Sequence, residues 1–230
     1  GDAVVIVPEG ATWRYFKGMA EPSTRQGAWR QLDFDDSSWL LGQAAIGYGE
    51  DFINTILGDM QGNYTSIYLR KTFDAANLDA IDQLILDVQF DDGVNLWING
   101  VLAYRNNVPG EDLACTAKAS TSIENNYFVT YDLGDPHTWL VQGRNVIAIQ
   151  VLNSSISGSS DCYIDVRLFG EKTEQAEPPD PIPSPVEHGQ PGQYEINAAW
   201  ESDEITTFNS DIRIPATAVQ PERTYRVRCR

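Results

Sequence analysis

Apolar and polar residues alternate in several short runs of this chain, and that period of two is the pattern that most limits its fold. The clearest runs are residues 83–90, 94–99, 127–133 and 162–169. Successive side chains of a β-strand point to opposite faces, so each run predicts a strand with one buried face. Asn99-Gly100 lies between two apolar runs and predicts a tight hairpin, because both residues tolerate positive φ. With helical patterning confined to one turn near residues 76–81, the sequence predicts an antiparallel β-sandwich with long end loops.

A change in composition divides the chain into a large and a small part. The predicted sandwich spans residues 1–172, and residues 173–192 contain six prolines, which exclude helix and inner strand and predict an extended linker. Residues 193–230 again alternate, with Tyr225 and Val227 separated by arginines. A segment this short cannot form an independent sandwich, so we predict a short C-terminal β segment that is part of a domain.

Charge and the motif inventory exclude several classes of function. The chain has 16 Lys and Arg against 33 Asp and Glu, a net charge of −17. Such a chain repels nucleic acid and anionic membrane surfaces, and no apolar run approaches the roughly 20 residues of a membrane span. Phosphate loops and nucleophile motifs are missing, and His137 and His188 lie in a turn and in the linker. Adjacent carboxylates without a cleft do not make a glycosidase, so we expect no enzyme activity.

The three cysteines bear on the cellular compartment. Cys115 and Cys162 flank strand-like runs in the predicted sandwich, whereas Cys229 lies beyond the linker. We expect Cys115 and Cys162 to form a disulfide, which would place the protein in an oxidising compartment. The alternative is that both are buried thiols.

Several motifs occur in an order that resembles a known family. They are residues 29–30, 34–39, 47–49, 68–73, 90–100 and 143–149. Together they resemble the galactose-binding-like jelly roll over about residues 11–170, the fold of many carbohydrate-binding modules and of the sugar-binding domain beside certain β-galactosidase barrels. The upstream motifs resemble a variant common in large secreted bacterial proteins. The tail, through Pro215, Pro221 and residues 224–228, resembles the second half of a fibronectin type III domain.

The resemblance implies a non-catalytic carbohydrate-binding module that binds glycan or polysaccharide through loops at one end of the sandwich. The parent would be a secreted or cell-surface bacterial protein, and the other domains of that chain would be the module's partners. The start at Gly1, without Met or a signal segment, fits a piece of a longer protein. Two alternatives stay open: a structural or adhesive spacer without sugar binding, and an accessory domain packed on an enzyme barrel.

A sugar site needs an aromatic face for stacking and planar polar groups for paired hydrogen bonds. Tyr48 with Glu50 and Asp51, in a loop between glycines, fits this need, as do Tyr64 and Asn153. These residue types are also ordinary in loops. Trp97 could provide a flat platform on a sheet face, but we expect a neighbouring strand or loop to cover it.

Asp91 and Asp92, at the end of a predicted strand, are the sharpest candidates for metal binding. Adjacent carboxylates repel each other unless a cation or hydrogen-bond donors neutralise them, and calcium prefers such oxygen ligands. Many relatives hold a structural calcium ion, and the motif also resembles the Asp-Asp-Gly of PA14 lectins, whose aspartates ligate calcium at the sugar. The alternative is a solvated turn in which one Asp accepts backbone N–H groups. Asp33, Asp35 and Asp36 form a second acidic group, for which we favour a capped turn with Trp39 buried behind it.

Overall fold

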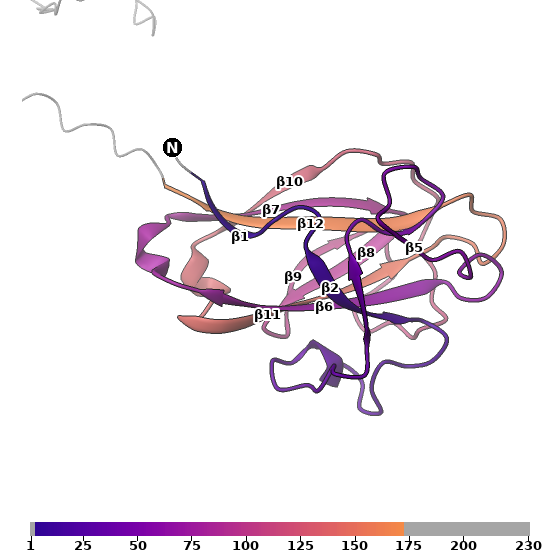
Figure 1. Ribbon diagram of the computed structural model, residues 1–230, viewed down its shortest axis with the longest axis horizontal. Helices are drawn as coiled ribbons and strands as arrows, with labels where there is room; N and C mark the ends of the chain where they lie inside the picture. The colour runs from indigo at the N-terminus through magenta and orange to yellow at the C-terminus, as the bar shows by residue number, and fades with distance from the viewer. Residues whose placement is uncertain (1–2, 173–230) are drawn as a thin grey trace, which may run out of the picture. The chain divides into compact units, whose positions relative to one another are not determined.

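The computed structural model describes residues 3–172, which form two β-sheets stacked face to face (Figure 1). The strands are β1 (Val4–Val7), β2 (Thr12–Lys17), β3 (Leu40–Gln43), β4 (Ile46–Tyr48), β5 (Thr55–Ile56), β6 (Ser66–Ala75), β7 (Gln83–Asp91), β8 (Gly93–Ile98), β9 (Val101–Asn106), β10 (Val129–Gly134), β11 (Gly143–Leu152) and β12 (Cys162–Glu171). The described part contains three short 3-10 turns, η1 (Ala28–Arg30), η2 (Leu78–Ala80) and η3 (Pro136–Thr138), and no α-helix. The predicted all-β sandwich is confirmed.

The strand order defines the two layers. Sheet A has the order β10-β7-β12-β4-β5, with β1 paired to β12, and sheet B has the order β3-β2-β6-β11-β8-β9. Within these two sheets β4 and β5 form a parallel pair, and the other pairs are antiparallel. In Figure 1, β7, β12 and β10 lie in the upper layer, and β6 and β11 lie in the lower layer. Both central strands, β12 and β11, are therefore hydrogen-bonded on both sides.

The core between the sheets follows the alternation in the sequence. Leu84, Leu86, Val88 and Phe90 of β7 are at most 1% exposed and pack in the same cluster as the inward residues of β8 and β12. Asn99 and Gly100 join β8 to β9 with φ values of 49° and 81°, so the predicted hairpin is confirmed.

A second apolar cluster covers the outer face of sheet B. Trp97 on β8 is fully buried there, and the segment between β2 and β3 contributes Trp29 and Trp39. The Arg30 guanidinium lies 3.8 Å from the centre of the Trp97 ring, and the Trp97 Nε1 donates to Glu111 at 3.1 Å. Trp97 is thus covered, as expected, and presents no platform to a ligand.

The expected disulfide is absent, because the two cysteines belong to different cores. Cys162 begins β12 and points between the sheets, whereas Cys115 packs in the outer cluster of sheet B. Both are buried free thiols. Sheet B separates them, so this correction leaves the alternative of two buried thiols and removes the argument for an oxidising compartment.

The predicted linker (173–192) and C-terminal β segment (193–230) lie outside the described residues and stay predictions. Residues 3–172 include no helix that could span a membrane.

Asp165, on the outer face of β12, makes the free energy of unfolding depend on pH. Its carboxylate is 6% exposed and accepts the backbone N–H groups of Gly10 at 3.1 Å and Val166 at 2.7 Å. Burial raises its pKa to about 6, against the lowering effect of these two hydrogen bonds, with Glu9 raising it and Arg167 lowering it further. The folded state therefore binds more protons than the unfolded state between pH 4 and 6, and stability falls as pH rises through that window.

We predict that Asp165→Asn removes this pH dependence, because the amide does not titrate and its oxygen, in the place of Oδ1, can accept from Val166 at 2.7 Å and from Gly10 at 3.3 Å. Relative to the variant, the wild type should lose about 2–3 kcal/mol of unfolding free energy between pH 4 and pH 7. Urea unfolding of both proteins at four pH values, with chelator present, measures the difference. Parallel pH profiles for the two proteins would contradict the assignment.

Candidate functional site

Three carboxylates from separate segments converge at one end of sheet A. Asp91 ends β7, Asp161 precedes β12, and Glu124 lies in the loop between β9 and β10. One carboxylate oxygen from each lies within 4.8 Å of the others. Asp91 and Asp161 are 1% and 4% exposed, while Glu124 is exposed. We call these three residues the acidic centre; it includes the predicted metal ligand Asp91.

The Asp91 carboxylate is the unusual member of the acidic centre. Both of its oxygens are buried and neither has a hydrogen-bond partner. Burial, followed by the charges of Asp92, Asp161 and Glu124, raises the Asp91 pKa to about 9. Carboxylate oxygens without donors are what a cation would satisfy, so this buried acidic triad could hold a metal ion.

The loop after β4 reaches the same place. Burial and then the charge of Asp161, which also hydrogen-bonds to it, raise the pKa of Glu50. The Phe52 ring packs edge-on against Tyr163, with 5.0 Å between ring centres and an 89° angle between planes. Tyr163 is buried beside Asp91 in the β7–β12 pairing and donates its hydroxyl to the Asn125 carbonyl at 2.6 Å. Tyr163 thus connects the β4–β5 segment with the loop that carries Glu124.

Asp92, the other predicted metal ligand, has a different role. Its side chain is fully buried, Oδ1 accepts the Ile123 N–H at 2.9 Å and Oδ2 accepts the Ser154 N–H at 2.6 Å. The Asp91–Asp92 peptide bond is cis. Asp92 therefore fastens the loops that carry Glu124 and Asp161, as the backbone-accepting alternative described, although in a buried rather than a solvated turn.

Tyr48, Tyr64 and Asn153, predicted to contact sugar, lie in the interior. They are 8%, 3% and 1% exposed, so neither ring offers a face for stacking. The reason is that the alternating pattern of β4 continues through Tyr48, whose ring joins the core between the sheets. Asn153 donates to the Tyr48 hydroxyl at 2.9 Å and to the Asp161 carbonyl at 3.4 Å. Tyr48 and Asn153 therefore hold the segment that positions Asp161, and Tyr48→Ala would damage the core.

The remaining candidate site residues predicted from the sequence lie in two places, the loop after β4 and the turn before β3. Glu50 is half-buried next to Asp161, and Asp51 is exposed in the same loop. Asp35, in the second acidic group, accepts the Ser37 N–H at 2.9 Å, and Asp36 pairs with Arg70 at 2.8 Å, which is the favoured capped turn. The sequence did not identify Asp161 or Glu124 as site residues. The one available signal was the position of Asp161, an acidic residue directly before the alternating run of β12.

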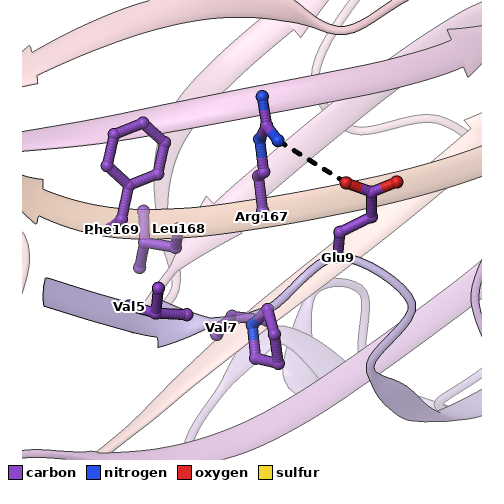
Figure 2. A pocket seen from close by; sticks show the side chains of 7 residues that line it. Val5, Val7, Glu9, Arg167, Leu168 and Phe169 are labelled. Atoms are coloured by element: carbon purple, nitrogen blue, oxygen red, sulfur yellow. Dashed lines mark hydrogen bonds and ion pairs between the residues drawn. The ribbon is translucent and has the colours of Figure 1, made fainter. Parts of the chain in front are cut away.

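A hollow lies farther along sheet A, where β1 pairs with β12 (Figure 2). Val5, Pro8 and Phe169 line it, and an ion pair of 3.5 Å between Arg167 and Glu9 borders it. Its lining is mostly apolar, and Val5 is 64% exposed.

No family model matches this sequence, and no curated protein matches it. Among solved structures, a beta-glucuronidase from Bacteroides uniformis matches with 17% identity and a TM-score of 0.49, over 74% of this chain and 18% of that one. A beta-glucuronidase from an uncultured Clostridium sp. matches with 9% identity and a TM-score of 0.46, over 74% of this chain and 29% of that one. A calcium binding mutant of Bacteroides uniformis beta-glucuronidase 2 matches with 16% identity and a TM-score of 0.44, over 70% and 17%. This chain therefore spans less than a third of the length of these solved chains.

Proposed function

We propose that the sandwich is a non-catalytic carbohydrate-binding module of a larger protein, and that glycan binds beside the acidic centre. The observation that carries the proposal is the Phe52 ring, which is 41% exposed while Tyr163 holds it edge-on. An exposed ring with a fixed orientation is a surface on which sugar C–H groups can stack.

Polar groups suited to sugar hydroxyls lie in the same loop and at the acidic centre. Glu50 and Asp51 precede Phe52 directly, and Glu124 is exposed across the acidic centre. Tyr127, three residues after Glu124, is 65% exposed and offers a second ring. An aromatic face with several acceptors is the composition of a small-ligand site. Because the chain carries a net charge of −17, neutral glycans are favoured over acidic ones.

The remaining parts of the proposal concern the setting of the module. A bound calcium ion belongs to it as a structural cofactor at the acidic centre. The resemblance to secreted bacterial modules supports an extracellular location, with other domains of the parent chain as partners.

We predict that Phe52→Ala weakens glycan binding about tenfold or more, because a central stacking ring commonly contributes about 2 kcal/mol. A glycan array identifies the ligand, and isothermal titration with the best hit measures the affinity. Tyr131→Ala is the control, since Tyr131 is 47% exposed on β10 and pairs with Leu86, five residues from Asp91 along β7. Circular dichroism checks that both variants fold.

Unchanged affinity in Phe52→Ala would place the site elsewhere. Absence of binding to every glycan would contradict the proposal and favour the second candidate, an accessory domain that packs on a neighbouring domain. The apolar hollow at Val5, Pro8 and Phe169 favours that candidate, because such a surface suits a docking partner (Figure 2).

A further inference from the structure

The acidic centre and the residue next to Glu124 provide two buried acceptor groups that nothing in the described chain satisfies. Asp91 is 1% exposed and both its oxygens lack a partner. Asn125, directly after Glu124, is 8% exposed and its Oδ1 also lacks a partner. Buried acceptors are normally paired, since leaving one without a donor costs about 1–3 kcal/mol and more for a charged group. These atoms therefore call for a ligand that provides positive charge or donors.

Within residues 3–172, no cationic side chain is recorded beside Asp91. The charges that act on Asp91 come from Asp92, Asp161 and Glu124, all of them negative. Arg167, four residues after Tyr163 on the same face of β12, is engaged with Asp87 and Glu9. Gathering carboxylates out of water without a counter-charge is strongly unfavourable, so the arrangement indicates an external cation.

The chemistry of the donors selects the ion. Carboxylates and an amide oxygen are hard ligands, which suit Ca²⁺ or Mg²⁺ rather than a metal that prefers nitrogen and sulfur. Oxygens that share one calcium ion at about 2.4 Å lie at most about 4.8 Å apart. The three carboxylates of the acidic centre meet this limit. Donors from several loops favour Ca²⁺, because Mg²⁺ requires a near-ideal octahedron and keeps much of its water.

We propose that Asp91, Glu124 and Asp161 bind one calcium ion, with Glu50 and the Asn125 side-chain oxygen as further donors. The ion joins the end of β7 to the loops before β10 and before β12, and to the segment that carries Phe52. Asp92 is not a ligand, because both its oxygens already accept backbone N–H groups. The inference depends on the acidic centre alone and holds whether or not the module binds glycan.

Isothermal titration of the chelator-treated full chain with calcium chloride tests the proposal. We expect one site per chain, and a melting temperature that rises by about 5 °C or more with millimolar calcium. Asp91→Asn and Asp161→Asn should each weaken calcium binding about a hundredfold or more, since each removes a ligand and a charge. Asp33→Asn, an exposed acidic residue outside the acidic centre, should bind calcium like the wild type.

The melting temperature in chelator distinguishes a residue that only binds calcium from one that also stabilises the calcium-free fold. Asp91→Asn should be at least as stable as the calcium-free wild type, because the amide carries no charge and can donate to its neighbours. No calcium binding by the wild type, unchanged affinity in both ligand variants, or equally tight magnesium binding would each overturn the proposal. Calcium binding without any glycan binding would contradict the proposed function alone.

Discussion

Replacing Arg70 by methionine should lower the free energy of unfolding by about 3–5 kcal/mol, because one buried guanidinium organises the long segment between β2 and β3. Arg70 on β6 is 1% exposed. Its Nε donates to Asp36 at 2.8 Å, Nη1 donates to the carbonyls of Trp29 and Gln31, and Nη2 donates to that of Phe34 at 3.4 Å. Methionine preserves apolar volume but leaves these acceptors without their donor.

Arg14 supplies the matched control, because it lies directly opposite Arg70 in the β2–β6 pairing. It is half-buried and makes one side-chain hydrogen bond, from Nη1 to the Trp39 carbonyl at 3.1 Å. Arg14→Met should therefore cost about 1 kcal/mol. Urea unfolding followed by tryptophan fluorescence compares the two, since Trp29 and Trp39 lie in the affected segment. Equal losses of unfolding free energy in both variants would show that the Arg70 contacts stabilise the fold no more than the single hydrogen bond of Arg14 does.

The strands were predictable because the physical rule behind them is local. A period of two places Leu86 and Val88 on one face whatever the rest of the chain does, and Asn99-Gly100 defines its turn within two residues. The role of Arg70 was not predictable in this way. Its partners lie 34 to 41 residues away, in a segment that has no regular pattern of its own.

The acidic centre shows the same limit for function. The sequence singled out Asp91 because a second aspartate, Asp92, follows it directly. In the structure the two side chains have different roles: Asp91 belongs to the acidic centre, whereas Asp92 accepts two backbone N–H groups. Asp161 joins Asp91 through the pairing of β12 with β7, and that register depends on the whole sheet. Tyr48 was taken for a loop residue because glycines flank it, whereas those glycines allow β4 to approach β12 closely: a Cβ on Gly47 would lie 2.0 Å from the Cys162 carbonyl oxygen. The sequence therefore showed which end of the sandwich mattered but not which side chains face solvent there.

Asp92→Ala should lower the free energy of unfolding by about 2–5 kcal/mol. The substitution leaves the N–H groups of Ile123 and Ser154 without an acceptor, and each unsatisfied group costs about 1–3 kcal/mol. Calcium affinity should also fall, by about ten- to a hundredfold, although Asp92 touches no ion, because those two loops carry Glu124 and Asp161. Urea unfolding in chelator and isothermal titration with calcium measure the two effects.

Asp91 gives the sharpest comparison. Without calcium, substitution of Asp92 should lower the free energy of unfolding, whereas substitution of Asp91 should leave it unchanged or raise it. Asp91→Asn should weaken calcium binding about a hundredfold or more while leaving the calcium-free fold at least as stable, because both Asp91 oxygens lack a partner and the amide adds a donor for the neighbouring carboxylates. Asp92→Asn should lie between, since its remaining oxygen can satisfy one of the two N–H groups. If Asp92→Ala instead proves neutral in chelator and loses only calcium binding, then Asp92 is a ligand, and the assignment of the two residues must be exchanged.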